Sequence, residues 1–234
     1  KKDMSKNKIS LGFFSGSRSD FGLISEIFLK AQKSNLFNTK LYLSGSHFKS
    51  EYGATLKEIQ KYSIKKSCKI LLQKMNTLDP RYYPITISQI TKKLSAHLKK
   101  DRLDFFIIHG DRFETFAATI ASTSMNIPTI QLEAGDITNG GTYDDVVRHS
   151  ISRLSHLLLT TNKDSQQRLI KQGEEKWRVN NIGVSSLSKI KNKKYASKIE
   201  IKKKFHINFD KPIIIFTFHP LSLNISKTKK HIKI

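Results

Sequence analysis

Apolar, strand-like runs alternate with amphipathic helical segments between residues 9 and 183 of this chain. The strand-like runs cover residues 9–16, 39–45, 62–72, 103–110, 127–133, 156–162 and 177–183. The helical segments cover residues 19–33, 52–60, 83–100, 112–125, 142–155 and 163–173. This alternation is typical of a parallel sheet that is covered by helices on both faces. The sequence therefore predicts an α/β fold for this part of the chain.

The ends of three expected helices carry residues that suit caps. Ser19 or Asp20 is placed to cap the first helix, and Thr142 is placed to cap the helix at 142–155. Gly173 follows the helix at 163–173 and is expected to end it.

A lysine-rich stretch separates this region from the end of the chain. Residues 189–208 are poor in apolar side chains, so we interpret them as a linker with a short helix. The run PIIIFTFHP at 212–220 then indicates a buried strand of a second domain. We therefore expect a first domain at 1–188, the linker at 189–208, and an incomplete second domain at 209–234. Because the chain also begins with Lys rather than Met, we expect it to be part of a longer protein.

The chain is strongly basic, with a formal net charge of +23. Such a charge raises nucleic acid as a partner. The lysines are, however, spread over expected helix faces and the linker, and no basic motif interleaved with aromatic residues is present. We therefore predict no specific nucleic-acid partner. The charge is also suited to an anionic nucleotide substrate.

The sequence carries no signal for a membrane or a secretory route. No apolar stretch reaches the roughly 18 residues that a span needs, and the N-terminal segment lacks the apolar core of a signal peptide. Cys68 is the single cysteine, which excludes an internal disulfide and suits a reducing compartment. We predict a cytoplasmic protein without membrane contact, and homo-oligomerisation is left open.

Reactive side chains follow several of the expected strands directly. Asp111, Glu133 and His219 each end an apolar run, and Arg18 lies in the small-residue loop after the first strand. Ligands of open parallel sheets bind beyond the carboxyl ends of the strands, and Arg at a helix start suits a phosphate. The loop lacks both the G-x-G-x-x-G spacing and the P-loop Lys-Ser/Thr pair, which disfavours a nicotinamide or ATP enzyme.

Four charged residues near the start of the helix at 142–155 are spaced in pairs. Asp144 and Arg148 are four residues apart, as are Asp145 and His149. These pairs suit either ordinary helix-stabilising contacts or acid–base chemistry, in which neighbouring carboxylates keep one member protonated. A metal site is a further interpretation of His109, Asp111, Glu133 and His149. It lacks a His-x-x-x-His or comparable spacing, so we predict no metal.

Six stretches of the chain resemble the hydrolysing UDP-N-acetylglucosamine 2-epimerases and their relatives that act on UDP-diacetamido-trideoxyhexoses. They are GSRSDFG, GSHFKSEYGATLKEI, HGDRFETFAA, NIPTIQLEAGDITNGGTYDDVVRHSISRLSH, LIKQGEEKWRVNNIG and FHPLSL, which together cover most of residues 9–223. HGDRFET with GGTYDDVVRH is the specific signature, because the non-hydrolysing epimerases carry a Pro-Glu-Glu…Asn-Arg pattern in place of YDDVVRH. LEAGD differs slightly from the family's usual Glu-Gly-Gly.

The resemblance implies a GT-B-like fold of two Rossmann-like domains, with the UDP-sugar between them. It implies no metal and no nicotinamide cofactor. The implied chemistry is loss of the carbon-2 proton with expulsion of UDP to give a glycal, followed by addition of water. The family's second domain carries a Gly/Ser-rich nucleotide loop that would lie beyond the last residue of this chain.

The resemblance also implies roles for individual residues. Asp111, Glu133 and Asp144 match the acid–base carboxylates of the family, and His219 matches its second-domain histidine at the nucleotide. Arg18 and Arg112 match positions that contact UDP, and we place Arg148 and His149 in the substrate site as well.

Several alternatives remain open at this stage. We favour Asp144 as the base, because a helix start keeps a carboxylate ionised and Arg148 is placed to orient it. The substrate is either UDP-N-acetylglucosamine, with N-acetylmannosamine as the product for sialic-acid synthesis, or a UDP-2,4-diacetamido-2,4,6-trideoxyhexose on a route to legionaminic acid. A binding module without catalysis, for nucleotides or nucleic acids, is the rival from another class.

Overall fold

A computed structural model describes residues 8–50, 55–73, 80–138, 143–192 and 195–217 of the chain. The chain divides into two compact units, Lys1–Ser188 and Lys189–Ile234.

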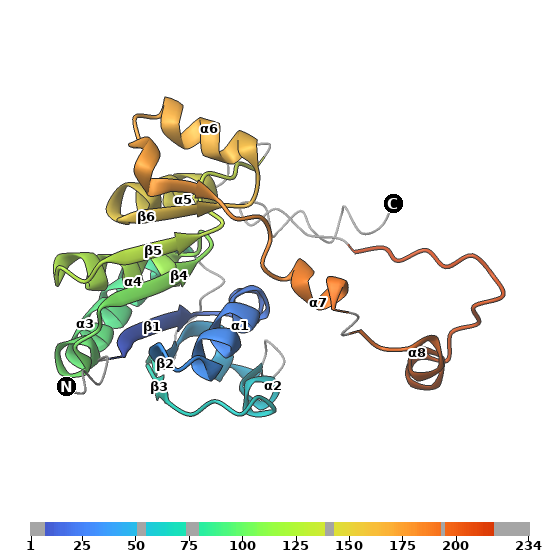
Figure 1. Ribbon diagram of the computed structural model, residues 1–234. Coiled ribbons are helices and arrows are strands. Elements are labelled where there is room, and N and C mark those ends of the chain that lie inside the picture. The colour runs from blue at the N-terminus through green and yellow to red at the C-terminus, as the bar shows by residue number, and fades with distance from the viewer. Residues whose placement is uncertain (1–7, 51–54, 74–79, 139–142, 193–194, 218–234) are drawn as a thin grey trace, which may run out of the picture. The chain divides into compact units, whose positions relative to one another are not determined.

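The first unit is built on one seven-stranded sheet in which every neighbouring pair is parallel (Figure 1). Its strands are β1 (Ile9–Ser15), β2 (Phe37–Leu43), β3 (Ser67–Lys69), β4 (Phe105–His109), β5 (Thr129–Leu132), β6 (Leu157–Thr160) and β7 (Val179–Asn181). The spatial order is β3-β2-β1-β4-β5-β6-β7. The predicted α/β class and parallel sheet are confirmed.

Helices connect the strands at the expected places. They are α1 (Arg18–Lys33), α2 (Thr55–Gln60), α3 (Tyr83–Asp101), α4 (Phe113–Ser124), α5 (Tyr143–Leu154) and α6 (Lys163–Lys171), with short 3-10 turns η1 (Gly45–Phe48), η3 (Pro80–Tyr82) and η4 (Lys176–Arg178). The cap of α1 is Ser17 and not Ser19 or Asp20, because the Ser17 side chain accepts from the Asp20 amide. Gly173 has a φ of +90°, as the predicted end of α6 requires. Thr142 lies outside the described residues.

Successive strand residues point to opposite faces of the sheet, and both faces are covered. Phe14 and Ile108 pack with buried residues of α3, α4 and α5, while Phe13 and Ile107 pack with α1 and α2. A smaller cluster joins α6 to β6 and β7. Burial on both sides explains why these strands are nearly continuous apolar runs.

The direction in which the chain crosses the sheet reverses at β1. From β1 the chain moves outward through β2 to β3, then returns to place β4 on the other side of β1. Such a switch point opens a crevice beyond the carboxyl ends of the two strands, and ligands of doubly wound sheets bind there. Here the crevice lies beyond Ser15 of β1 and His109 of β4.

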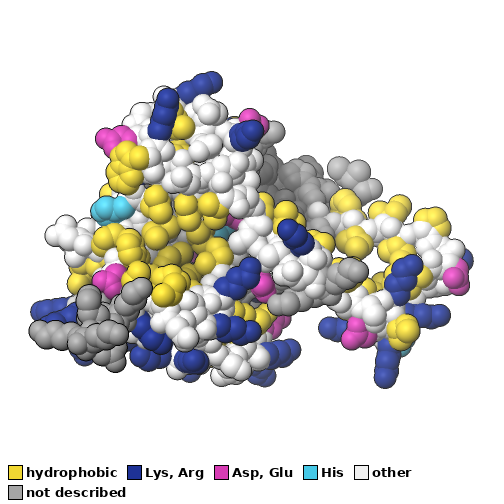
Figure 2. Space-filling view, viewed as in Figure 1, with side chains coloured by type: hydrophobic (Ala, Val, Ile, Leu, Met, Phe, Trp, Pro, Cys, Tyr) yellow, Lys and Arg dark blue, Asp and Glu magenta, His cyan; other side chains and the backbone are white. Residues whose placement is uncertain are grey.

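Figure 2 shows charged and apolar side chains together on one face. In the face that Figure 2 shows, Lys and Arg side chains lie around a central apolar area and do not form a single stripe. Among the described residues, no helix combines the length and apolar character that a membrane span requires.

The second unit contains α8 (Lys198–Phe205), which is a short helix of the kind expected at 189–208. Ser197 and Glu200 form a capping box at its start. α7 (Leu187–Lys191) precedes it. The strand predicted at 212–220 is wrong in its described part, since residues 212–217 have no regular structure and Ile214 is 91% exposed. An apolar run becomes a strand only when neighbouring strands bond to it, and none of the described strands pairs with this run.

Candidate active site

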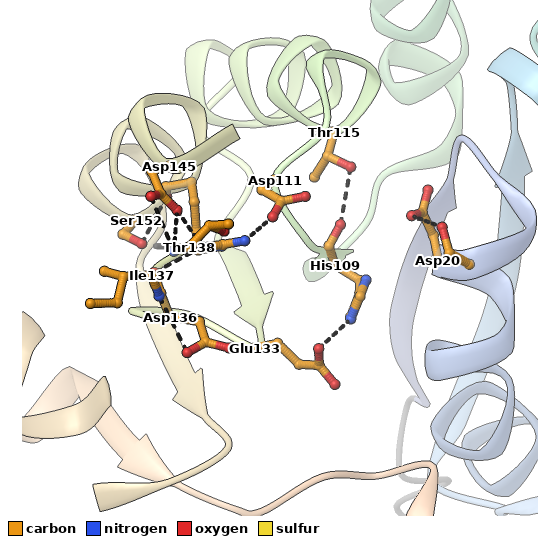
Figure 3. Close-up of polar contacts among 12 residues, drawn as sticks. Asp20, His109, Asp111, Thr115, Glu133, Asp136, Ile137, Thr138, Asp145 and Ser152 are labelled. Atoms are coloured by element: carbon orange, nitrogen blue, oxygen red, sulfur yellow. Dashed lines mark hydrogen bonds and ion pairs between the residues drawn. The ribbon is translucent and has the colours of Figure 1, made fainter. Parts of the chain in front are cut away.

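Polar side chains from separate elements meet at the carboxyl edge of the sheet. Figure 3 shows His109 and Asp111 at the end of β4, Glu133 after the neighbouring β5, and Asp145 on α5 beside them. Asp111 and Glu133 are brought together because β4 and β5 are adjacent and parallel. Asp144 lies in the first turn of α5.

Arg148 of α5 is the central cation of this cluster. Its Nη2 donates to Asp111, and its Nη1 donates to Oδ1 of Asp145 at 2.9 Å and to the carbonyl oxygen of Asp136 at 2.9 Å. Only 11% of its side chain is exposed. The expected pairing of Arg148 with Asp144 is wrong, because the guanidinium turns to Asp145, three residues back. Arg148 thus ties α5 to the loops after β4 and β5.

His109 and Glu133 form a second pair, with Nε2 of the histidine 3.1 Å from Oε2 of the carboxylate. The contact with His109 holds the pKa of Glu133 below its usual range, and the charge of Arg148 acts in the same direction. Glu133 also has a φ of +58°. A non-glycine residue in the left-handed region is strained, and such strain is concentrated at functional sites.

Asp144 has the opposite electrostatic setting. Partial burial raises its pKa, and the negative charge of Asp111 raises it further, against the opposing charges of Arg112 and Arg148. Burial and the neighbouring acid thus raise the pKa of this carboxylate although it lies at a helix start, and the expectation that it acts in its ionised form stays a prediction. Two carboxylates of the cluster, Glu133 and Asp144, therefore have pKa values displaced in opposite directions.

Arg112 precedes α4, and Glu114 in the first turn holds it. Its Nε and Nη2 donate to the two carboxylate oxygens of Glu114 at 3.1 and 3.0 Å. Burial lowers the pKa of Arg112, but the charge and hydrogen bonds of Glu114 outweigh burial and raise it above its usual value. The charge of Arg112 also acts on Asp144, so this cation belongs to the same electrostatic cluster.

Three aromatic rings lie beside these charges. Tyr83 stacks on Phe113 with ring centroids 4.2 Å apart, and Tyr143 lies 5.7 Å from Tyr83. Burial raises the pKa of the Tyr83 hydroxyl, and Arg112 and Asp144 are among the charges that act on it. Neither these rings nor Glu114 was predicted from the sequence. The one available signal for them was their position at the first turns of α3, α4 and α5.

The remaining predicted residues lie elsewhere or outside the description. Arg18 begins α1, but its Nε donates to Glu58 of α2 at 3.0 Å, and its side chain is 73% exposed. These two residues line a pocket of about 580 Å³ against α1 and α2. His149 follows Arg148 and is half-buried, which lowers its pKa. His219 lies outside the described residues.

Beneath the loop after β1 lies a buried histidine that was not predicted. His47 of η1 is 1% exposed and contacts Oγ of Ser15 at 2.8 Å and Oγ1 of Thr55 at 3.0 Å. Burial lowers its pKa to about 4, against the opposing charge of Asp20. A neutral imidazole therefore supports the end of β1.

The edge contains no arrangement of three His, Cys, Asp or Glu side chains suited to a metal ion, within the ranges that the structure describes. It does contain carboxylates with pKa values moved both ways, beside two arginines. Such a site can remove a weakly acidic proton, return a proton elsewhere and stabilise a departing anion.

Comparison with known proteins finds relatives that match this chain over nearly its whole length. A GDP/UDP-N,N'-diacetylbacillosamine 2-epimerase (hydrolyzing) of Campylobacter jejuni is 32% identical over 231 residues, which are 98% of this chain and 59% of that protein. A UDP-N,N'-diacetylbacillosamine 2-epimerase (hydrolyzing) of Legionella pneumophila is 28% identical over 93% of this chain and 57% of its own length. The chain thus spans little more than half the length of these relatives.

The fold matches solved epimerase structures over a similar share. The UDP-GlcNAc 2-epimerase of Neisseria meningitidis, solved with UDP-GlcNAc, superposes with a TM-score of 0.68 at 21% identity, over 84% of this chain and 54% of that one. This first unit corresponds to the N-terminal half of the GT-B-like epimerase structures. The family model described as UDP-N-acetylglucosamine 2-epimerase matches residues 29–233. With the fold and the sequence match in agreement, the chain belongs to the UDP-N-acetylglucosamine 2-epimerase family.

Proposed function

We propose that this chain carries the acid–base part of a hydrolysing UDP-N-acetylhexosamine 2-epimerase, which converts UDP-N-acetylglucosamine to N-acetylmannosamine and UDP. The observation that carries the proposal is the group of Asp111, Glu133 and Asp144 at the carboxyl ends of β4 and β5 and the start of α5, all three within reach of the charge of Arg148. No cofactor takes part in this chemistry.

The reaction has two stages that need a proton acceptor and a proton donor. In the first, a base takes the carbon-2 proton, the C–H electrons form a double bond between carbons 1 and 2, and the bond from carbon 1 to the UDP oxygen breaks. In the second, water loses a proton to a base as its oxygen bonds to carbon 1, and an acid delivers a proton to carbon 2 on the other face. The product is a free sugar with inverted carbon 2.

The opposite pKa displacements of Asp144 and Glu133 support different roles for them in proton transfer. Asp144, with its raised pKa, is the stronger base toward a weakly acidic proton and we assign it the carbon-2 proton. His109 favours the ionised form of Glu133, so we assign Glu133 to accept the proton that the attacking water loses in the second stage. Asp111, fixed by Arg148, orients the substrate or shares in proton transfer.

The arginines support departure of UDP. Arg112 presents a guanidinium beside the acids, and bidentate donors of this kind suit a diphosphate. Arg18 lies at the start of α1, where an anion is favoured by the helix dipole. His149 and His219 remain proposed members of the substrate site.

A second substrate is favoured by the relatives. Both the Campylobacter and Legionella proteins are named for N,N'-diacetylbacillosamine, and one of them is 32% identical to this chain. The same chemistry on a UDP-2,4-diacetamido-2,4,6-trideoxyhexose is therefore the alternative. The free sugar that is released distinguishes the two substrates, because one leads to sialic acid and the other to legionaminic acid.

The test compares the 234-residue chain with the same chain joined to the remaining length of the Campylobacter relative. Both are given each UDP-sugar in heavy water, and UDP and the free sugar are followed by NMR. We expect the joined protein to turn over one of them, with inversion and one deuterium at carbon 2. Inversion without deuterium excludes the elimination mechanism.

The short chain is expected to have negligible activity and weak affinity for UDP, because the superposed epimerase structure extends over nearly twice the matched length. Comparable turnover by both proteins would place the whole site in the first unit. Failure of the joined protein with both sugars, together with salt-sensitive binding to DNA or RNA, would favour a binding module instead.

A further inference from the structure

Glu114 is a buried acid that the proposed reaction does not use. It lies in the first turn of α4 and is 2% exposed, and both oxygens of its carboxylate accept hydrogen bonds from Arg112. Burial raises its pKa, and the charge of Asp20 raises it further, while Arg112 lowers it. An acid in this position is destabilising without its arginine, so its presence needs a reason.

Two glycines leave the space that Glu114 occupies. A Cβ added at Gly16 would lie 2.8 Å from Cβ of Glu114, and one added at Gly45 would lie 2.4 Å from the carbonyl oxygen of Gly16 and 3.0 Å from Oε1 of Glu114. Gly45 also has a φ of +61°. Both glycines are the centre of a Ser-Gly-Ser tripeptide, one after β1 and one after β2. The two loops are therefore shaped around the side chain of one residue on α4.

The loops are also bonded to each other above Glu114. The amide of Ser46 donates to the carbonyl oxygen of Gly16 at 2.9 Å, and the amide of Ser44 donates to the carbonyl oxygen of Ser15 at 3.0 Å. The side chain of Glu114 is therefore enclosed by its own helix α4 and by the loops after β1 and β2. The side chain of Arg112 that Glu114 holds is 40% exposed, so part of it remains accessible to a ligand.

We propose that Glu114 is a positioning residue, which holds the Arg112 guanidinium in the orientation that receives the diphosphate of the UDP-sugar as it leaves. The proposal rests on the proposed function. The carboxylate partly cancels the charge of Arg112, which weakens its attraction for a diphosphate in the ground state. Glu114 instead fixes the orientation of the Arg112 guanidinium. Hydrogen-bond donors that are oriented in advance stabilise the charge that develops in the transition state.

The first test is a cycle of turnover measurements on the joined protein, with Glu114→Gln, Arg112→Lys and the double variant. We expect Glu114→Gln to lower kcat about 10–100-fold with little change in KM, as for a group that acts only in the transition state. In the Arg112→Lys background the second change should have almost no further effect. Full additivity, or a loss confined to KM, would overturn the proposal.

Glu174→Gln is the matched control. Glu174 is also a buried glutamate, with 3% of its side chain exposed, and it pairs with Arg153 at 2.9 Å and Arg178 at 3.4 Å. It lies away from the acid cluster, so its variant should keep the kcat of the unmodified protein at equal folded concentration. An equal loss of kcat in this control would assign the Glu114 effect to general loss of structure.

A second measurement separates this proposal from the proposed function, because it needs no turnover. The Nε–Hε signal of Arg112 is followed by NMR in the joined protein while UDP is added. We expect UDP to shift the signal in the unmodified protein and in Glu174→Gln, and to leave it nearly unchanged in Glu114→Gln. If no sugar is turned over but this pattern holds, the proposed reaction fails and the positioning role stands. An unchanged signal in the unmodified protein, or an equal response in Glu114→Gln, overturns the positioning role.

Discussion

The imidazole Nε2 of His109 lies 3.1 Å from Oε2 of Glu133, and this contact joins the ends of the adjacent strands β4 and β5. The carboxylate reaches the histidine from a backbone with a φ of +58°. The left-handed region costs an ordinary residue about 1 kcal/mol relative to glycine. Glu133 is thus a position where stability and the proposed chemistry oppose each other.

Replacement of Glu133 should show this opposition directly. We expect Glu133→Gly to unfold with a free energy about 1 kcal/mol higher than Glu133→Ala, because only glycine adopts the left-handed backbone without strain. Both variants should lose turnover in the joined protein. Urea unfolding of the two variants is the measurement, and an alanine variant as stable as the glycine variant would show that the backbone relaxes on mutation.

Asp144→Asn should lower turnover by about 10²–10⁴-fold, the usual loss for a residue that transfers a proton. Affinity for UDP should be nearly unchanged, since the amide keeps the size of the side chain. Asp164→Asn, which changes an exposed first-turn aspartate of α6, is the control. Wild-type rates in Asp144→Asn would leave this carboxylate with only a structural role.

Arg148→Met should destabilise the first unit by about 2–3 kcal/mol. The change leaves Asp111 and Asp145 without their shared cation, and the side chain that held them is 11% exposed. The comparison is Arg18→Met, which breaks a pair with side chains 73% and 48% exposed and should change stability by less than about 1 kcal/mol. Chemical unfolding of both variants measures the two losses of stability. Equal losses would argue against a central role for Arg148.

His47 should make folding sensitive to mild acid. Its folded pKa of about 4 lies below the ordinary histidine pKa of 6.5, so the unfolded chain binds more protons between these values and stability falls as pH falls. From pH 7 to pH 5 the loss from this residue is about 2 kcal/mol. In His47→Gln the pH dependence of the unfolding free energy should be smaller by that amount. An unchanged dependence would mean that His47 is protonated in the folded protein at pH 5.

The strands and helices of the first unit could be predicted because their patterns are local. The apolar run at 103–110, for example, contains β4, whose residues 106–109 are buried. The side chains that face one another could not be predicted in the same way. Spacing along α5 allows Arg148 to pair with the residue three or four positions back. It pairs with Asp145, because Arg148 also bonds to Asp111 and Asp145 also accepts from the amide of Thr138.

Features that depend on elements distant in the sequence were still harder to predict. The burial of Glu114 requires Gly16 and Gly45 from two other loops, and a Ser-Gly-Ser tripeptide is common in loops of any kind. The run at 212–217 shows the reverse case. Its composition is typical of a buried strand, but composition provides no neighbour to pair with.

The insertion of β4 beside β1 has a consequence for how the molecule is made. Ser10 bonds to Asp104, 94 positions later, so the inner edge of β1 stays open while the intervening chain is synthesised. An open edge pairs readily with other chains, and such long-range pairing is slow to form. The acid cluster, which needs β4, β5 and α5 in place, can therefore assemble only late on the ribosome. Nascent chains that end before residue 105 should be the most prone to aggregate, which a series of stalled lengths would reveal.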